Sequence, residues 1–317
     1  MKKILCLLII LIFSCNNNDE NKIAIVIHGG AGIILKENIS KSKEDSIISK
    51  LDEAISRGWK LLKEGESSEL AVIETIKILE DSPLFNAGKG SVFNSNGIVE
   101  NDASIMRGND LNAGASSGTS NVKNPITLAA DVMNHSKHVF LSGYGAENFA
   151  KKRNLEIVDN EYFHTKFRNN QLQNKKNKDK YGTVGCVAID IDGNIVAGTS
   201  TGGVTNKKWG RIGDSPIIGA GTYANNSTCG VSSTGTGEYF IRTVAAYQVS
   251  SLLENHNYDL KKAMSKVIHE KIGGIGGDGG MIGIDKNSNI SMEFNTPGMY
   301  RAYVNKNGEK EIFLYEE

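Results

Sequence analysis

The chain has 317 residues, with 36 Lys and Arg against 36 Asp and Glu, so its formal net charge is zero. This balance argues against a general electrostatic grip on nucleic acid, and we expect no nucleic-acid partner. Hydrophobic residues make up 39% and charged residues 23%, which is typical of one large globular domain or two ordinary ones. Glycine is abundant (35) and proline rare (4), which favours tight turns over low-complexity linkers.

The first residues are typical of an export signal. A basic start, Met1–Lys3, precedes an unbroken apolar run, Ile4–Phe13, which is too short to span a bilayer because that takes about 20 residues. Ser14–Cys15 then resembles a bacterial lipobox, although Phe13 stands where a small residue is usual. We therefore expect a signal peptide over 1–14, lipidation of Cys15, and a tether over 15–21. Plain secretion with an idle Cys15 is the alternative.

The expected location is accordingly the periplasm or cell envelope, with membrane contact only through the lipid anchor. In the body of the chain the only cysteines are Cys186 and Cys229. Two cysteines make neither a disulfide framework nor a four-ligand zinc site, so buried structural thiols are expected.

The pattern of apolar residues predicts the elements of the first half. Residues 22–27 are expected to form a buried strand that ends in a tight turn at His28–Gly32. Residues 43–62 carry apolar side chains at helical spacing, with Gly65 as the stop signal, and a second helix is expected over 68–79. Short elements around another helix are expected over 125–130 and 139–141.

The composition changes at residues 163–180, which are polar and basic and lack apolar periodicity. We interpret about 160–182 as an exposed linker. A strand is predicted over 181–190, a hairpin turn at Asp192–Gly193, and a return strand over 195–203. A single helix is expected over 238–254, followed by strands over 280–285, 289–294 and 301–304. Two halves of strands and helices indicate sheets layered with helices.

Several motifs fail on their context. Gly274–Gly279 matches a dinucleotide fingerprint, but a strand follows it where a helix is needed, so backbone turns are expected. Gly114–Gly118 and Gly198–Gly202 match a nucleophile elbow, but neither leads into a helical pattern. His135 and His138 lack further ligands at zinc spacing and are interpreted as surface residues.

Thr183 is different, because it stands directly after the linker and Gly182. A threonine at the start of a strand is ordinarily only a β-former. It becomes a nucleophile when a base lies beside it, and its own α-amine, with a reference pKa of about 7.7, can be that base. The amine exists only if the chain is cut before Thr183. A flexible linker that ends in glycine is what such a cut needs.

With this threonine in view, the chain resembles the plant-type asparaginases and isoaspartyl peptidases, which are N-terminal nucleophile hydrolases. The resemblance runs from Ile25 to Tyr300, and its order and spacing make it specific. The stretches that carry it are Ile27–Gly32, Pro83–Gly88, Asp102–Met106, Gly182–Gly185, Thr199–Gly203, Arg211–Pro216, Thr234–Glu238 and Asn295–Met299.

The resemblance implies that the precursor cleaves itself between Gly182 and Thr183. The Thr183 hydroxyl is then implied to attack a side-chain amide carbonyl, giving an aspartyl ester that water hydrolyses. Thr201 is implied to lie beside Thr183 and to position or polarise it. The bland alternative for Thr201 is a strand hydroxyl facing solvent.

The resemblance also implies an oxyanion hole formed by the Thr234 hydroxyl and the Gly235 amide. The start of a helix presents free N–H groups to negative charge, although the same residues could simply cap the helix. Arg211 and Asp214 are implied to bind the substrate's carboxylate and amine, with a surface salt bridge within one loop as the alternative. Further implied substrate-binding residues are Asn86, Ile212, Gly213, Thr236 and Gly237.

A sodium-binding loop is implied before residue 90, where mainly backbone carbonyls ligate a structural ion. The implied positions are Leu79, Glu80, Ser82, Phe85, Ala87 and Lys89, of which Lys89 replaces an often apolar residue. No cofactor is expected for the chemistry itself.

The resemblance implies an α+β fold, a four-layer αββα sandwich, cut into an α subunit over 22–182 and a β subunit over 183–317 that form one catalytic domain. A dimer of these αβ units is expected. The expected substrates are β-aspartyl dipeptides and L-asparagine. One alternative is cleavage of N-glycosylated asparagine, although such enzymes usually have Asp where this chain has Gly182 and Asn where it has Gly203. Another is an uncut, inactive binding lipoprotein.

Overall fold

The structure, a computed structural model, describes residues 22–174 and 182–316. The predicted signal peptide, Cys15, the tether up to residue 21 and residues 175–181 of the predicted linker lie outside this part of the chain. Within it the fold mixes helices with sheets. The helices are α1 (Lys41–Lys63), α2 (Ser68–Glu80), α3 (Pro125–His135), α4 (Gly143–Lys152), α5 (Lys166–Gln173), α6 (Gly237–Thr243), α7 (Ala245–His256) and α8 (Leu260–Ser265), which a π-helical turn (Lys266–Ile272) continues.

The strands form two sheets. The larger has the order β12-β11-β1-β5-β6-β2-β3-β4 and the smaller β10-β9-β8-β7. All neighbours are antiparallel except β3 and β4. The strands are β1 (Ala24–Gly32), β2 (Asn101–Arg107), β3 (Ala113–Thr119), β4 (Phe140–Ser142), β5 (Val184–Ile189), β6 (Ile195–Thr201), β7 (Thr222–Ala224), β8 (Cys229–Gly235), β9 (Gly279–Asp285), β10 (Ile290–Phe294), β11 (Gly298–Val304) and β12 (Lys310–Tyr315).

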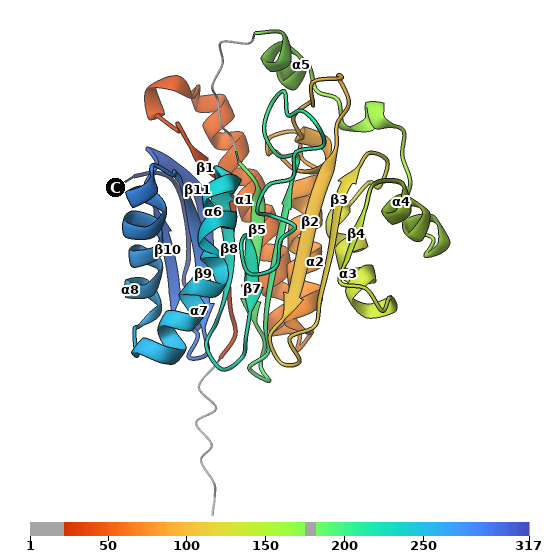
Figure 1. The fold of residues 1–317 in the computed structure, drawn as a ribbon. Helices are drawn as coiled ribbons and strands as arrows, with labels where there is room; N and C mark the ends of the chain where they lie inside the picture. Colours follow the sequence, from red (N-terminus) through yellow and green to blue (C-terminus); the bar gives the residue numbers. More distant parts are fainter. Residues whose placement is uncertain (1–21, 175–181, 317) are drawn as a thin grey trace, which may run out of the picture.

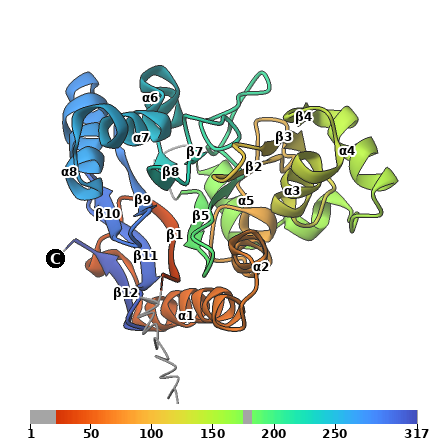
Figure 2. The same ribbon diagram turned by 90° about the horizontal axis from the view of Figure 1, so that it is seen from below.

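The three largest hydrophobic clusters in the described part of the chain lie between its layers. One lies between the larger sheet and helices α1, α2 and α3. A second lies between the two sheets, where Val26 and Val187 share a cluster with Ile282 and Ile284 of β9. A third lies between the smaller sheet and α7 and α8. Figures 1 and 2 accordingly show α1 and α2 on one side of the sheets and α7 and α8 on the other. Alternating apolar faces on the central strands hold the sheets together.

The first two helices begin and end where their sequence signals indicate. The Ser40 side chain accepts a hydrogen bond from the Lys43 amide at the start of α1, and the Ser67 side chain caps α2 in the same way. Gly65 follows α1 with a φ of 81°. The predicted helices over 43–62 and 68–79 are therefore confirmed to within two residues.

Two predicted boundaries are wrong. The expected turn at His28–Gly32 is the continuation of β1, because an irregularity between His28 and Gly30 shifts the register while pairing with β11 continues. The expected helix over 238–254 is two helices, α6 and α7, which meet at Val244 with a left-handed φ of 49°. At the start of α7, the amides of Ala246 and Tyr247 donate to the carbonyls of residues 220 and 219 on a neighbouring loop. These amides therefore do not bind carbonyls of α6, and the helix is interrupted.

The predicted linker is also structured in its first part. Residues 166–173 form α5, and Arg168 is only 2% exposed although its neighbours are polar. Its Nε donates to the Gly90 carbonyl at 2.7 Å and its Nη1 to the Gln171 side chain at 3.0 Å. Leu172 of the same helix packs against the buried Phe93 and Phe163. One apolar and one polar contact therefore hold α5, too few to give the sequence an apolar period.

Several smaller predictions are confirmed. Cys186 and Cys229 are free and buried, and Asp192–Gly193 turns between β5 and β6, with Gly193 at a φ of 79°. Residues 273–275 form a single 3-10 turn, and Gly276, at a φ of 84°, turns the chain towards β9. No helix in the described part of the chain is long and apolar enough to cross a membrane.

Candidate active site

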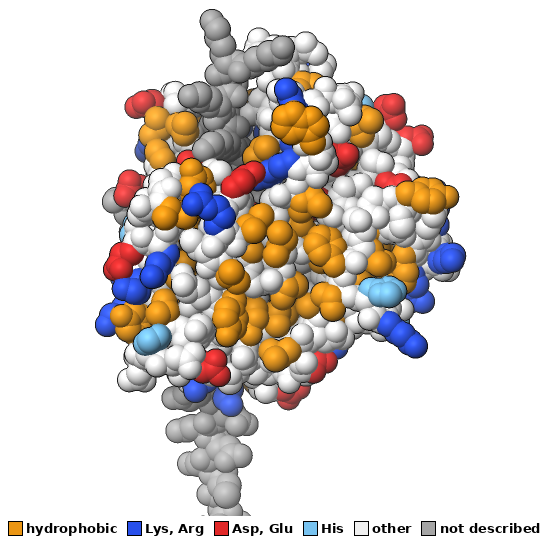
Figure 3. Space-filling model, in the orientation of Figure 1, with side chains coloured by type: hydrophobic (Ala, Val, Ile, Leu, Met, Phe, Trp, Pro, Cys, Tyr) orange, Lys and Arg blue, Asp and Glu red, His pale blue; other side chains and the backbone are white. Residues whose placement is uncertain are grey.

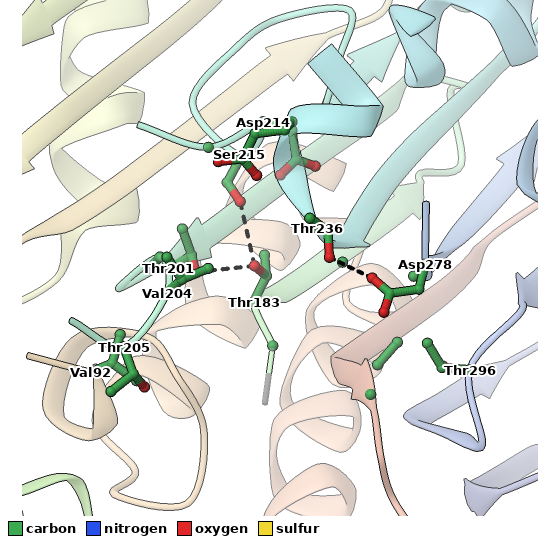
Figure 4. Close-up of a pocket in the computed structure, with 18 of the residues that line it drawn as sticks. Val92, Thr183, Thr201, Val204, Thr205, Asp214, Ser215, Thr236, Asp278 and Thr296 are labelled. Carbon is green, nitrogen blue, oxygen red and sulfur yellow. Dashed lines mark hydrogen bonds between the residues drawn. The ribbon is translucent and has the colours of Figure 1, made fainter. Parts of the chain in front are cut away.

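Thr183 lies at the start of β5, a central strand of the larger sheet, and is 6% exposed. Its Oγ1 donates to Oγ1 of Thr201 at 3.0 Å, and the Ser215 Oγ lies 3.5 Å away (Figure 4). The hairpin of β5 and β6 explains the first contact. Val184, the first residue of β5, pairs with Ser200 of β6. Thr183, just before β5, therefore comes opposite Thr201, the last residue of β6. The structure thus brings Thr183 and Thr201 together, as predicted.

A cavity of about 370 Å³ opens beside Thr183. Most of the predicted site residues line it, namely Gly182, Thr183, Thr201, Arg211, Gly213, Asp214, Gly235 and Thr236. It also contains Ser215, Glu238, Asp278 and Thr296, which the sequence analysis did not assign to the site (Figure 4 labels all but Glu238). Its size suits a dipeptide or smaller ligand. The structure does not place Thr234, Ile212, Gly237 or Asn86 in the cavity wall.

Gly182 lies in a narrow gap between β1 and β8. A Cβ atom on it would lie 2.4 Å from Oγ1 of Thr234 and 2.8 Å from the Cα of Gly30. Gly30 itself has a φ of 112°, and a Cβ there would meet the backbone of residue 182 at 2.8 Å. The bond between residues 182 and 183 therefore runs through a space that only glycine fits on both sides.

The Thr234 hydroxyl lies beside this bond and accepts a long hydrogen bond of 3.4 Å from the Ala31 amide. Gly235 ends β8, and α6 begins at Gly237. The Thr236 hydroxyl does not cap α6 but donates to the Asp278 carboxylate (Figure 4). Strand β8 therefore brings Thr234 next to Gly182 and ends with Gly235 in the cavity wall, and α6 follows directly.

Arg211 and Asp214, which are predicted to bind the substrate's carboxylate and amine, both line the cavity but do not form a salt bridge with each other. Nε and Nη2 of Arg211 each donate to Glu238, both at 2.9 Å. Asp214 is 3% exposed, and its Oδ2 is buried without a hydrogen-bond partner among residues 22–174 and 182–316. Burial raises its pKa to about 7. A buried carboxylate with a free oxygen is suited to a cationic amine, because such a ligand offsets the cost of its burial.

Ile212 and Asn86, also predicted to bind substrate, lie outside the cavity wall. The Ile212 side chain is 39% exposed on the loop before Asp214. The Asn86 amide donates to the Gly203 carbonyl at 2.7 Å, and its oxygen accepts from the Val92 amide at 3.0 Å. Asn86 thus fixes the loop that follows Thr201 from behind the cavity.

The implied sodium loop leaves α2 and is tightly turned. A Cβ at Gly88 would lie 2.4 Å from the Glu80 carbonyl oxygen, and one at Gly90 would lie 2.0 Å from the Phe85 carbonyl oxygen. Backbone carbonyls therefore crowd the inside of this loop. The Lys89 ammonium lies 5.2 Å from the centre of the Tyr162 ring. Leu79, Glu80, Ser82, Phe85 and Ala87 are all buried.

The Glu80 side chain makes contacts with β6 that the sequence did not indicate. It is fully buried, and its Oε1 accepts hydrogen bonds from the Ser200 hydroxyl at 2.6 Å and the Ile126 amide at 2.9 Å. Burial raises its pKa to about 8. Glu80 therefore supports β6 next to Thr201, from the face of the sheet opposite the cavity.

Sequence reasoning missed the role of His28 in this site. His28 is fully buried, its Nδ1 donates to the Thr183 carbonyl at 3.0 Å, and its Nε2 lies 3.0 Å from the Ser232 hydroxyl. Burial lowers its pKa to about 3, so the ring is neutral. His28 and Ser215 stand in stretches that carry the family resemblance, and that was their only signal. Nothing in the sequence indicated the partners of Glu238 and Asp278.

Comparison with known proteins adds an independent line of evidence. A sequence model of the family described as asparaginase matches residues 21–314. The chain is 46% identical to the isoaspartyl peptidase of Escherichia coli, over 89% of this chain and 92% of that protein. It is 45% identical to a putative isoaspartyl peptidase/L-asparaginase of Dictyostelium discoideum (90% and 94%). It is 41% identical to a plant-type L-asparaginase of Pyrococcus furiosus (91% and 98%).

Proposed function

The chain belongs to the asparaginase family, a family of hydrolases, and we propose that it hydrolyses β-aspartyl dipeptides and the side-chain amide of L-asparagine. The single observation that carries the proposal is the buried contact of 3.0 Å between the hydroxyls of Thr183 and Thr201 beside a cavity of about 370 Å³. The layers of helix, sheet, sheet and helix support the αββα fold of N-terminal nucleophile hydrolases.

Activation is proposed to begin with the chain cutting itself. The Thr183 hydroxyl attacks the Gly182 carbonyl carbon, the peptide nitrogen leaves as the Thr183 α-amine, and water hydrolyses the resulting ester. The product is an α subunit over 22–182 and a β subunit over 183–317. The fit of Gly182 against Thr234 supports this step, because a larger residue would push the carbonyl away from its place.

The new α-amine is then proposed to act as the general base for the Thr183 hydroxyl. The hydroxyl attacks the side-chain carbonyl of the substrate, an amine or ammonia leaves, and water hydrolyses the aspartyl ester. The Thr234 hydroxyl and the Gly235 amide are proposed to stabilise the oxyanion, at a cost of about 3 kcal/mol when one such donor is lost.

Substrate recognition is proposed to rest on opposite charges at two points. Arg211, held by Glu238, takes the α-carboxylate, and Asp214 takes the α-ammonium. Because burial raises the pKa of Asp214 to about 7, the approach of an ammonium group would favour its ionised form.

The proposal is tested by the intact mass of the purified protein under denaturing conditions. Two chains are expected, the smaller starting at Thr183 with about 15 kDa of the 34.3 kDa total. Thr183→Ala is expected to remain uncut and to leave β-aspartyl dipeptides intact. A cut or active Thr183→Ala protein would contradict the mechanism.

Two alternative functions give different outcomes in the same experiments. Faster hydrolysis of N-glycosylated asparagine than of a β-aspartyl dipeptide would favour a glycosylasparaginase. A wild-type chain that remains uncut after long incubation would favour an inactive binding lipoprotein.

A structural sodium ion is proposed in the loop that follows α2. The close approach of the Glu80 carbonyl to Gly88 and of the Phe85 carbonyl to Gly90 supports it, because hard cations prefer oxygen ligands and this loop brings backbone oxygens inward. Bound sodium would fix the loop that carries Asn86. A higher melting temperature in sodium chloride than in tetramethylammonium chloride of equal ionic strength is expected, and equal temperatures would argue against the ion.

The cleaved protein is further proposed to form a dimer of αβ units. Figure 3 shows hydrophobic side chains gathered near the middle of the face viewed in Figure 1. Val244 and Tyr247, at the start of α7, are 48% and 44% exposed. Exposed apolar patches of this kind mark protein contacts. Light scattering on the eluting protein should give twice the mass of one αβ unit.

Export through the predicted signal, with lipidation of Cys15, remains part of the proposal. Membrane fractionation of Cys15→Ser tests it, since the variant is expected in the soluble fraction and the wild type in the membrane fraction.

A further inference from the structure

A line of buried side chains crosses the space between the two sheets and ends at Thr183. Thr222 of β7 donates to Thr199 of β6 at 2.6 Å, and the Thr199 hydroxyl lies 2.7 Å from that of Ser232 on β8. The Ser232 hydroxyl lies 3.0 Å from Nε2 of His28 on β1, whose Nδ1 lies 3.0 Å from the Thr183 carbonyl. All four linking side chains, those of Thr222, Thr199, Ser232 and His28, are 0% exposed.

The Thr183 carbonyl, at the end of this line, fixes which group donates in each of its hydrogen bonds. The Thr183 carbonyl can only accept, so Nδ1 of His28 carries the proton. The neutral ring then accepts at Nε2, and Ser232 must donate to it. Each hydroxyl has a single proton, so Thr199 must donate to Ser232, and Thr222 to Thr199. Hydrogen bonds aligned in this way polarise and strengthen one another.

The far end of the line returns to the same site. The Ser104 hydroxyl of β2 can donate its single proton either to the Thr222 hydroxyl at 2.8 Å or to the Ser215 carbonyl at 2.6 Å. The Ser215 hydroxyl lies 3.5 Å from that of Thr183. The polar groups from Thr222 to His28 therefore hold the Thr183 carbonyl, and their far end lies next to Ser215, whose hydroxyl is close to that of Thr183.

We propose that this line from Thr222 to His28, the polar line, positions Thr183 for attack, with His28 and Ser232 as its principal positioning residues. The inference rests on the proposed function. After the proposed cleavage, Thr183 begins a chain and loses its covalent link to Gly182. A fixed carbonyl then restricts rotation about its Cα–C bond and so fixes where the amine and the hydroxyl point. Orientation of this kind strongly affects rate.

The test removes hydroxyls one at a time while preserving side-chain shape. Ser232→Ala leaves Nε2 of His28 without a donor, and Thr222→Val removes the first donor of the polar line. Thr228→Val is the matched control, because Thr228 is also buried, at 4% exposed, and its hydroxyl lies 2.6 Å from that of Ser250 but belongs to no part of the polar line. The readouts are the self-cleavage rate, kcat and KM for a β-aspartyl dipeptide, and the melting temperature.

We expect Ser232→Ala to lower kcat and the self-cleavage rate by about tenfold and Thr222→Val by less, with KM within about twofold of wild type. Thr228→Val should lower the melting temperature only. If Ser232→Ala keeps wild-type rates and loses only stability, as the control does, the positioning role is wrong while the proposed function stands. A wild-type protein that neither cuts itself nor hydrolyses the dipeptide overturns both.

The tautomer of His28 gives a readout that does not depend on activity or on cleavage. Nitrogen-15 NMR on histidine-labelled Thr183→Ala protein should show one neutral ring protonated at Nδ1, and its signals should vanish in a Thr183→Ala, His28→Asn double variant. A His28 ring protonated at Nε2 would reverse the donors and overturn the proposal.

Discussion

Glu80 is expected to make the protein less stable as the pH rises from acid to mildly alkaline values. Its carboxyl is fully buried and accepts hydrogen bonds at Oε1 from Ser200 and the Ile126 amide. Its Oε2 is buried without a hydrogen-bond partner in the described part of the chain. Burial disfavours the ionised form more than these donors favour it, so the pKa rises from 4.5 to about 8.

The size of the effect follows from this shift. The folded state keeps the Glu80 proton up to about pH 8, whereas the unfolded chain releases it near pH 4.5. Stability from this group is therefore fully present below pH 4.5 and is lost as the pH rises towards 8. The expected slope is about 1.4 kcal/mol per pH unit, or about 4 kcal/mol between pH 5 and pH 8.

Urea unfolding of Glu80→Gln at several pH values measures this directly. The host is the Thr183→Ala protein, so that a single uncut chain unfolds, and the buffers contain no sodium. Glutamine keeps an acceptor for Ser200 and does not ionise, so the free energy of unfolding should lose its slope of about 1.4 kcal/mol per pH unit relative to the host. Asp214 and His28, whose pKa values are also shifted, are present in both proteins and cancel in the comparison.

Glu66→Gln is the matched control, because Glu66 is exposed and the change removes the same charge. It should leave the slope unaltered. If Glu80→Gln has the same pH dependence as the host, the Glu80 carboxyl is ionised in the folded protein, and the reasoning from burial is refuted.

Three further predictions concern other parts of the chain. Gly182→Ala should slow self-cleavage at least about a hundredfold on denaturing gels, since its Cβ would lie 2.4 Å from the Thr234 hydroxyl; wild-type cleavage would contradict the fit. Glu238→Gln should raise KM about fivefold with little change in kcat, because Arg211 loses its bidentate partner; a lower KM would mean that Glu238 competes with substrate. Val244→Asn should raise the free energy of unfolding by about 1 kcal/mol in urea, because asparagine tolerates a φ of 49° better than valine, and an unchanged value would argue against strain there.

The parts of the fold that follow from local signals were predictable from the sequence. The serines before α1 and α2, the apolar period of both helices and the Asp192–Gly193 turn each act within a few residues of where they stand. The Thr183 hypothesis likewise needed only a linker, a glycine and a strand in succession. Its partners came from the family resemblance.

What the sequence could not predict depends on contacts between distant segments. The break at Val244 follows from amides of α7 binding carbonyls of residues 219 and 220, which no helical period records. The helix α5 is held by Arg168, which binds the Gly90 carbonyl 78 residues away, and by Leu172, which packs against Phe93 and Phe163. The pairing of Arg211 with Glu238 likewise joins two elements whose separation in sequence carries no signal.

The polar line poses a physical problem of its own, because it lies between two sheets that are otherwise joined by apolar side chains. A buried hydroxyl without a partner costs about 1–3 kcal/mol, so an incomplete line would be worse than an apolar one. The line avoids this cost because each member donates its single proton to the next. Replacing Ser232 by alanine therefore removes two hydrogen bonds, one from Thr199 and one to His28, and leaves Nε2 of His28 without a donor. This arrangement makes the orientation of Thr183 depend on four residues that do not themselves line the cavity.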